Sequence, residues 1–183
     1  GHPVLVDPGT YCYQSEPLWR RYFRSTIAHN TLELGGADQA AQAGLFLWSS
    51  QPMSWLESAS GIDQGDIAEL AVAHDGYRRL KPPATHRRRF RYDRANAHLL
   101  IEDRVDAQAP VAARLAFHLD PSVECRLEGA HATLLWPAGS ASLDLPGNLT
   151  WRIHRGETQP PLGWHSAEFG ERVPTVSLSG AES

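Results

Sequence analysis

Short runs of alternating apolar and polar residues recur about a dozen times along this chain, and Gly, Pro, Asn or Asp separates them. Strands of this length at this spacing are typical of a β-sandwich, and helical periodicity is scarce. The sequence therefore predicts an all-β fold, an antiparallel β-sandwich of about a dozen strands. A chain of 183 residues can bury a hydrophobic core without disulfides or metal ions to stabilise it. No interior linker divides the chain, so residues 1–183 are predicted to form a single domain.

Alternation is clearest in residues 86–93. Arg87, Arg89 and Arg91 fall on one face of this predicted strand, and two aromatic residues fall on the other. We expect residues 99–105 to pair with it as an antiparallel hairpin. The arginines could face an anionic polymer, but on an alternating strand such a face is more often solvated.

One segment, residues 15–30, breaks the strand pattern, since Leu18 and Tyr22 fall at helical spacing. We interpret it as a loop with one helical turn. At the other end of the pattern, a strand begins only two residues after Gly1. We therefore expect the chain to be the C-terminal fragment of a longer protein.

Composition excludes several classes of function. A formal net charge of -4 gives no general attraction to nucleic acid or to anionic membranes, so an anion-binding site must be local. No apolar run approaches the roughly 20 residues that cross a bilayer, so no membrane span is predicted. Cys12 and Cys125 lie far apart, and their spacing assigns no disulfide and no compartment.

Two candidate site residues stand where strands end or begin. Asp7 ends a run and is followed by Pro-Gly, so it could be a turn residue that caps its own backbone or a carboxylate offered at a sheet edge. His29 stands just before the next strand-like run and could be structural, a metal ligand or a proton acceptor. An aspartate and a histidine on neighbouring strand ends would supply two of the three protein ligands of a zinc site, and local spacing supplies no third.

The stretch "HDGYRRL", residues 74–80, contains a turn, and its Tyr77 could be an exposed proton donor or a packed ring. The other histidines are scattered without His-x-His spacing, and neither a nucleophile elbow nor a phosphate-binding loop is present. The local patterns alone do not assign a catalyst.

Four stretches taken in order carry a resemblance to a known family. "VLVDPGTYCY", "WRRYFRSTIAHNT", "HDGYRRL" and "HRRRF" resemble the heparinase II/III-like polysaccharide lyases, from about Pro3 to Val105. The pair Asp-Pro-Gly-Thr-Tyr and Arg-Ser-Thr-x-x-His-Asn-Thr is its most specific part. The remainder is similar only as further β-sandwich and in a "GWHS" to "VPT" ending.

The resemblance implies an N-terminal α/α toroid, absent from this chain, followed by antiparallel sheets, with a cleft between them. Such enzymes cleave uronic-acid polysaccharides, such as heparan sulfate or alginate, by β-elimination. It implies that Asp7 and His29 are two ligands of a zinc ion whose third ligand, a histidine, lies upstream of this chain. The family's catalytic residues match no position here, so no catalytic residue is assigned, and the chain alone is expected to be inactive.

Three further residues are predicted to line the sugar chain: Tyr22, Arg24 and Asn30. An arginine can pair with a uronate carboxylate, and a tyrosine can stack on a sugar ring. The alternative is that Arg24 fixes a loop and Tyr22 packs beneath it. The implied partners are an anionic polysaccharide and the toroid of the same protein, in the periplasm or outside the cell. The rival function is a carbohydrate-binding or exopolysaccharide-assembly module without catalysis.

Overall fold

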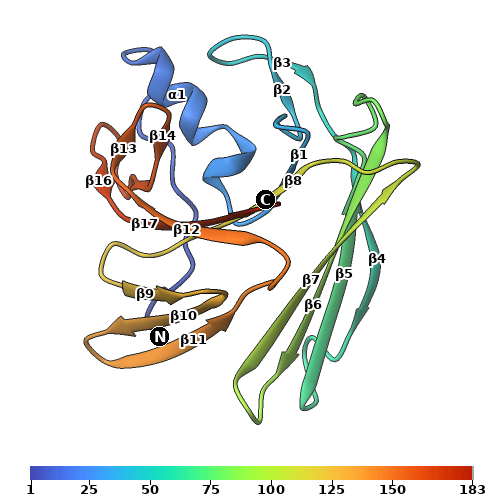
Figure 1. The fold of residues 1–183 in the computed structure, drawn as a ribbon, viewed down its shortest axis with the longest axis vertical. Coiled ribbons are helices and arrows are strands. Elements are labelled where there is room, and N and C mark those ends of the chain that lie inside the picture. The colour runs from blue at the N-terminus through green and yellow to red at the C-terminus, as the bar shows by residue number, and fades with distance from the viewer. Residues whose placement is uncertain (183) are drawn as a thin grey trace. The chain divides into compact units, whose positions relative to one another are not determined.

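The computed structural model of the chain, which describes residues 1–182, is built mainly from antiparallel strands (Figure 1). The prediction of an all-β, sandwich-like fold is confirmed. The chain forms two compact units, which are described separately: unit 1 comprises Gly1–Asp38, Gln42–Leu47 and the chain from Ala112 onward, and unit 2 comprises Gln39–Ala41 and Trp48–Val111. The prediction of a single domain over residues 1–183 stays a prediction.

Unit 1 contains two antiparallel sheets and two small hairpins. The four-stranded sheet has the order β1 (Leu32–Leu34), β8 (Ala113–His118), β17 (Val176–Ala181) and β12 (Thr150–Arg155). The three-stranded sheet has the order β11 (Gly139–Asp144), β10 (His131–Trp136) and β9 (Glu124–Glu128) and lies below it in Figure 1. The hairpins are β13 (Glu157–Thr158) with β14 (Pro161–Leu162), and β15 (Trp164–His165) with β16 (Val173–Pro174).

The core of unit 1 lies around β17, which is buried from Val176 to Gly180 because strands flank it on both sides. Gly180 pairs with Trp151 across the β12–β17 ladder. A Cβ atom at Gly180 would lie 2.5 Å from the Trp151 ring, so only glycine lets this indole lie flat on the sheet. The indole also stacks on Phe117 at 6.2 Å between ring centroids. This aromatic pair anchors the sheet on which the candidate site is built.

The segment expected to be a loop with one helical turn is more regular than predicted. It forms helix α1 (Pro17–Phe23) and a 3-10 turn η1 (Thr26–Ala28). Pro17 suits the first helical turn because its missing N–H is not needed there. Trp19, Tyr22 and Phe23 occupy positions i, i+3 and i+4 and are all buried, so they form the inner face of the helix.

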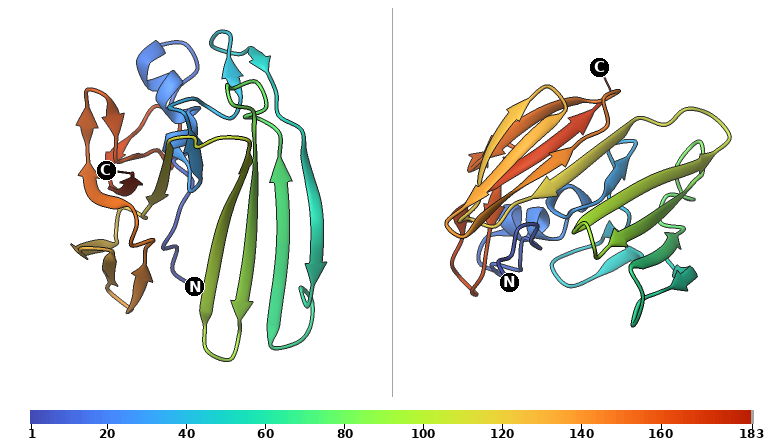
Figure 2. Two further views of the ribbon diagram at one scale, coloured as in Figure 1. Left: turned by 45° about the vertical axis from the view of Figure 1, so that its right-hand side comes forward. Right: turned by 90° about the horizontal axis from the view of Figure 1, so that it is seen from below.

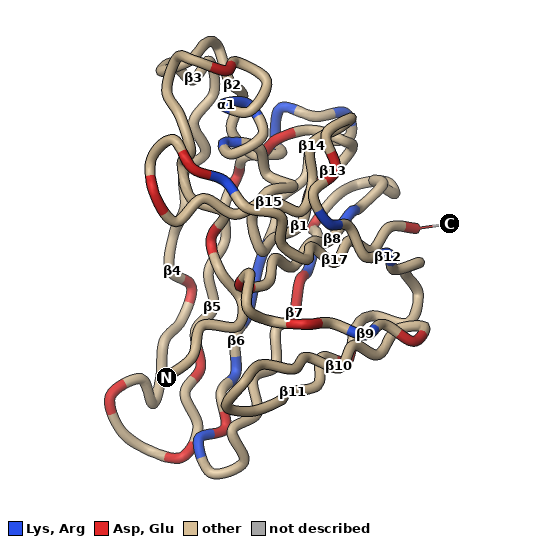
Figure 3. The backbone as a smooth tube through the Cα atoms, turned by 90° about the vertical axis from the view of Figure 1, so that its left-hand side faces the viewer, with Lys and Arg blue, Asp and Glu red and all other residues tan. Residues whose placement is uncertain are grey.

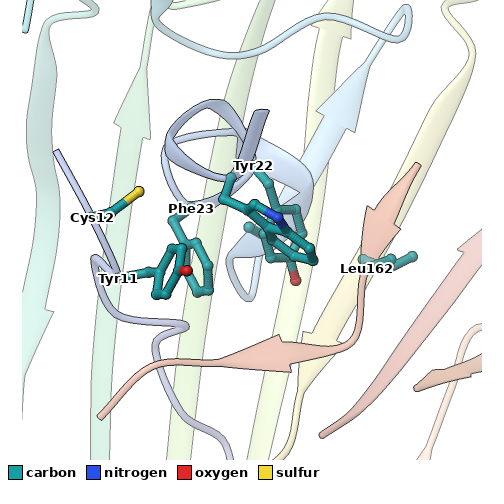
Figure 4. Close-up of a cluster of buried hydrophobic side chains, with 7 residues drawn as sticks. Tyr11, Cys12, Tyr22, Phe23 and Leu162 are labelled. Carbon is teal, nitrogen blue, oxygen red and sulfur yellow. The ribbon is translucent and has the colours of Figure 1, made fainter. Parts of the chain in front are cut away.

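This inner face packs into an aromatic cluster with Tyr11, Cys12 and Leu162 (Figure 4). The rings of Tyr11 and Phe23 lie 5.6 Å apart, within the normal range for aromatic pairs. Packing, rather than propensity, therefore holds this short helix in place. No helix among the described residues is long and apolar enough to span a membrane. Cys12 and Cys125 are both free thiols.

Unit 2 is an antiparallel meander of four strands, β4 (Ser54–Ser60), β5 (Ile67–His74), β6 (Ala84–Asp93) and β7 (His98–Ala107) (Figure 2). The predicted hairpin is confirmed, since β6 pairs with β7 from Ala84–Ala107 to Asp93–His98. A bulge interrupts β4 between Leu56 and Ser58. Two short strands, β2 (Ala41–Gln42) and β3 (Trp48–Ser50), lie where the chain passes between the units.

The arginine-rich strand β6 is neutralised by carboxylates on the strands beside it. Arg87 pairs with Asp106 at 2.6 Å, and Arg89 pairs with Glu69 at 2.8 Å. In Figure 3, blue positions gather along β6, and red positions lie along β4 and β5. These ion pairs fit the solvated-face interpretation and leave β6 without an uncompensated basic surface for an anionic polymer.

Candidate functional site

Asp7 and His29, the two residues predicted to share a metal, lie side by side in unit 1. The chain before Asp7 runs along β8, where Val6 N–H donates to the His118 carbonyl. His29 is the residue that closes the 3-10 turn before β1. Asp7 Oδ2 lies 2.9 Å from His29 Nδ1, and the two side chains are 71% and 37% exposed. A carboxylate and an imidazole thus meet at an accessible surface, although 22 residues separate them in sequence.

The two oxygens of Asp7 have different partners. Oδ1 accepts a hydrogen bond from Gly9 N–H at 3.0 Å, which is the turn cap considered from the sequence. Oδ2 faces His29. The turn and the histidine contact therefore coexist, because the turn holds the carboxylate in a fixed orientation toward the imidazole.

Gly9 is the residue that makes this turn possible. Its φ of 84° lies in the left-handed region, and a Cβ atom there would lie 2.0 Å from the Ser166 carbonyl oxygen. We predict that Gly9→Ala lowers the free energy of unfolding by about 2–3 kcal/mol, since it combines backbone strain with a backbone clash. Urea denaturation measures the change. Gly147→Ala, at a glycine with open space around its Cβ position, is the control and should stay within about 1 kcal/mol. Equal effects of the two changes would contradict this account of the turn.

Asn30 holds the segments that carry Asp7 and His29. Its Nδ2 donates to the Val6 carbonyl at 3.0 Å, and its Oδ1 accepts from His118 N–H at 2.6 Å. These bonds bridge the Asp7 segment and β8. They are structural contacts, and the predicted contact of Asn30 with sugar stays a prediction.

His118 lies beneath the pair, was not singled out by any local motif and is fully buried. Its Nε2–H donates to the Ile27 carbonyl at 2.9 Å, so its Nδ1 accepts from the Ser177 hydroxyl at 2.6 Å. Burial lowers its pKa to about 4, which keeps it neutral. Since both ring nitrogens are used, His118 supports the site but does not offer a further ligand.

The comparison with known families follows this geometry. The family described as "Heparinase II/III-like, C-terminal" matches residues 1–181. The chain belongs to this family. It is thus a domain related to polysaccharide lyases. No curated protein and no solved structure matches the chain.

The donor set of this heparinase II/III-like domain fits part of a zinc site. Carboxylate oxygen and imidazole nitrogen are both usual zinc ligands at about 2.0–2.2 Å, which places two ligands of a tetrahedral site about 3.4 Å apart. The observed separation of 2.9 Å is shorter than that value, so the two side chains would have to move slightly apart to hold an ion between them. Among residues 1–182 no group of three or more His, Cys, Asp or Glu side chains is placed to hold a metal. A zinc site would therefore need a ligand in addition to Asp7 and His29.

In the same domain, Tyr22 and Arg24 have the contacts of the structural alternative. Tyr22 is 5% exposed, its hydroxyl accepts from Trp164 N–H at 3.4 Å, and burial raises its pKa to about 12. The Arg24 guanidinium donates to the carbonyls of Gly44 and Leu45 at 2.6 and 2.9 Å and so fixes this loop. The sugar contacts predicted for both residues stay predictions.

The "HDGYRRL" motif of this heparinase II/III-like domain contributes to a buried polar network in unit 2. Tyr77 is fully buried, so it is a packed ring and not an exposed proton donor. Gly76 N–H donates to His74 Nδ1, so His74 Nε2 carries a proton and donates to His86 Nδ1 at 3.1 Å. His86 Nε2 then donates to Asp103 at 2.7 Å. The strand register, which pairs His74 with His86 directly, creates this chain of bonds, and local spacing gave no sign of it.

This network predicts a pH dependence of stability. Burial, with the nearby His86, lowers the pKa of His74 from 6.5 to about 4 in the folded chain. The neutral form is therefore favoured by folding, and its contribution is complete above pH 6.5 and is lost as pH falls toward 4. Between pH 6.5 and 4, the free energy of unfolding should therefore fall by about 1–2 kcal/mol less in His74→Gln than in the unchanged chain. This value allows for the partial exposure of the His74 side chain.

Urea titrations at several pH values measure this slope. His118 contributes a slope of the same sign, so the relevant quantity is the difference between His74→Gln and the unchanged chain. His98→Gln, which replaces an exposed histidine on β7, is the control and should leave the slope unchanged. Parallel pH profiles for His74→Gln and the unchanged chain would rule out this source of acid sensitivity.

Proposed function

We propose that this domain is the β-sheet part of a polysaccharide lyase that cleaves uronic-acid-containing polysaccharide by β-elimination, and that Asp7 and His29 hold a zinc ion at its cleft wall. The observation that carries the proposal is the 2.9 Å contact between these two exposed side chains. They come from the two motif stretches that distinguish the family, and the family match covers residues 1–181.

The chemistry of β-elimination explains why a zinc ion beside the substrate would be useful. β-Elimination removes the proton next to a uronate carboxylate, which requires a neutralised carboxylate, a base and an acid for the leaving oxygen. A zinc ion, when bound, would supply fixed positive charge beside the anionic polymer. The role of this chain is to hold the ligands: the Asp7 turn orients one, and Asn30 with His118 supports the segment that carries the other. The base, the acid and the third zinc ligand are proposed to come from the α/α toroid and the segment joining it to this domain.

The proposed substrate also suggests where the protein acts. Polymers of uronic acid are encountered outside the cytoplasm, so we place the enzyme in the periplasm or among secreted proteins. Its partners would be an anionic polysaccharide and the toroid of the same protein.

Activity measurements test this function on protein expressed from its complete reading frame. Heparan sulfate and alginate are incubated separately, and the ultraviolet absorbance of the unsaturated product is followed. We expect unsaturated product from one of the polymers. The rate of its formation should be at least about 100-fold lower with His29→Ala. His131→Ala is the matched control, because His131 also pairs with an exposed aspartate, Asp144, at 2.7 Å, and it should retain full activity. Binding of a uronate polymer without any unsaturated product would instead support a non-catalytic carbohydrate-binding or exopolysaccharide-assembly module.

A further inference from the structure

The loop between β15 and β16 is bonded to a segment near the start of the chain. Ser166 N–H donates to the Pro8 carbonyl at 2.8 Å, and Gly170 N–H donates to the Tyr11 carbonyl at 2.7 Å. Both segments belong to unit 1. We call this loop, residues 166–172, the clasp, because its backbone holds the earlier segment at two points.

The clasp bears on Asp7 through Gly9. Gly9 forms a parallel β-bridge with Ser166, and a Cβ atom at Gly9 would lie 2.0 Å from the Ser166 carbonyl oxygen. Gly9 N–H is also the donor to Asp7 Oδ1 at 3.0 Å. The Asp7 side chain is 71% exposed, so packing does not fix its orientation. The direction of the carboxylate therefore depends on where the clasp holds Gly9.

Arg172, the last residue of the clasp, places its guanidinium among three aromatic rings. The Cζ atom lies 4.0 Å from the centre of the Trp19 ring, 4.4 Å from that of Tyr11 and 5.5 Å from that of Trp164. A cation within about 6 Å of a ring centre is attracted to the face of the ring. Trp19 belongs to α1, Trp164 to β15 and Tyr11 to the segment that the clasp holds. One side chain thus joins three parts of unit 1.

The polar contacts of Arg172 do not by themselves explain this position. Its Nη1 lies 3.3 Å from Glu16 Oε1, but Glu16 is 41% exposed, and pairs of this kind contribute little. Its Nε is shielded from solvent and has no acceptor among residues 1–182, which costs free energy. Attraction to the three rings must offset this cost. The aromatic cage is therefore the interaction that fastens the clasp.

We propose that Arg172 is a positioning residue for Asp7. By fastening the clasp to the aromatic cage, it holds Gly9 where its N–H directs the Asp7 carboxylate toward His29. Arg172 acts only through these neighbours, because its own contacts are with Glu16 and the rings. The orientation of Asp7 needs no metal, whereas its use as a zinc ligand rests on the proposed function.

Hydrogen exchange of single amides tests this role in the protein expressed from its complete reading frame, with a zinc chelator present and mass spectrometry as the readout. Arg172→Met keeps an unbranched apolar side chain and removes the charge. It should speed exchange of the Gly9 and Gly170 amides about tenfold, because the clasp opens more easily without the cation–π contacts. Arg172→Lys should speed exchange less, because a cation remains in the cage. The amides of the buried strand β17 should not change.

Arg152→Met is the matched control, since it makes the same substitution at an exposed position on β12 in the same unit. It should leave the Gly9 and Gly170 amides unchanged. Three results would overturn the proposal: an unchanged Gly9 amide in Arg172→Met, equal acceleration in Arg152→Met, or equal acceleration of the β17 amides. The last of these would show that Arg172 stabilises the whole unit and does not act on the Asp7 turn.

Zinc binding by the same variants provides a second readout. Arg172→Met should weaken the affinity for zinc by about tenfold, and Arg172→Lys should weaken it less, because Arg172 supports a ligand without being one. A faster Gly9 amide with an unchanged zinc affinity would also overturn the positioning role. Absence of zinc from the unchanged protein would contradict the proposed function, and the exchange of the Gly9 amide would then decide on the clasp by itself.

Discussion

Replacing Asp103 by alanine should lower the free energy of unfolding by about 3–5 kcal/mol. The change breaks a buried ion pair and leaves Arg88 and His86 without their carboxylate acceptor. Arg88 donates to the two oxygens of Asp103 at 2.7 and 2.8 Å, and the two side chains are only 10% and 12% exposed. His86, 3% exposed, uses the same carboxylate as its acceptor. Burial raises the pKa of Asp103, but the hydrogen bonds from His86 and Arg88 outweigh it and lower the pKa below its usual range. The carboxylate therefore stays charged and paired.

A neighbouring carboxylate on the same strand is the control for this prediction. Asp106 also pairs with an arginine, Arg87, at 2.6 Å, but it is 34% exposed. Asp106→Ala should therefore cost no more than about 1 kcal/mol. Urea denaturation of both variants measures the difference. If Asp103→Ala proves as mild as Asp106→Ala, the pair is not effectively buried and the network does not stabilise unit 2.

The sequence predicted the fold where the strand signals were local. The alternation of Arg87, Arg89 and Arg91 placed β6 correctly, and the following turn residues placed the β6–β7 hairpin. Helix α1 was predicted too short because its stability comes from packing. The burial of Trp19 and Phe23 depends on Tyr11 and Leu162, and the second of these lies far along the chain. No window of sequence contains that contact.

The candidate site shows the same limit. A turn at Asp7 follows from Asp-Pro-Gly, but its contact with His29 depends on how two separate segments reach β8. His118 carried no signal, because its role comes from bonds to Ile27 and Ser177 that are distant in sequence.

The second large effect concerns zinc. We expect Asp7→Ala and His29→Ala each to weaken zinc binding, because each would remove a proposed direct ligand of the ion. The loss should exceed the roughly 10- to 100-fold that is typical when only an outer partner of a ligand is removed. The two changes should not add, since two ligands of one ion act as a unit. A double variant of Asp7 and His29 should therefore bind zinc about as poorly as either single variant.

The exposed pair His131 and Asp144 is the control, because it has the same two types of zinc-binding side chain but lies outside the proposed zinc site. Its nitrogen and oxygen lie 2.7 Å apart, but both side chains are more than half exposed and belong to one β-hairpin. An equal loss of zinc on His131→Ala would show that exposed histidines bind the ion without selection.

The central claim is that Asp7 and His29 bind one zinc ion. Its most direct test is elemental analysis of zinc in the protein expressed from its complete reading frame and purified without added metal. We predict about one zinc per chain for the unchanged protein and for His131→Ala, and less than about a tenth of that for Asp7→Ala and for His29→Ala. A full zinc content in either of these last two variants, or none in the unchanged protein, would contradict it.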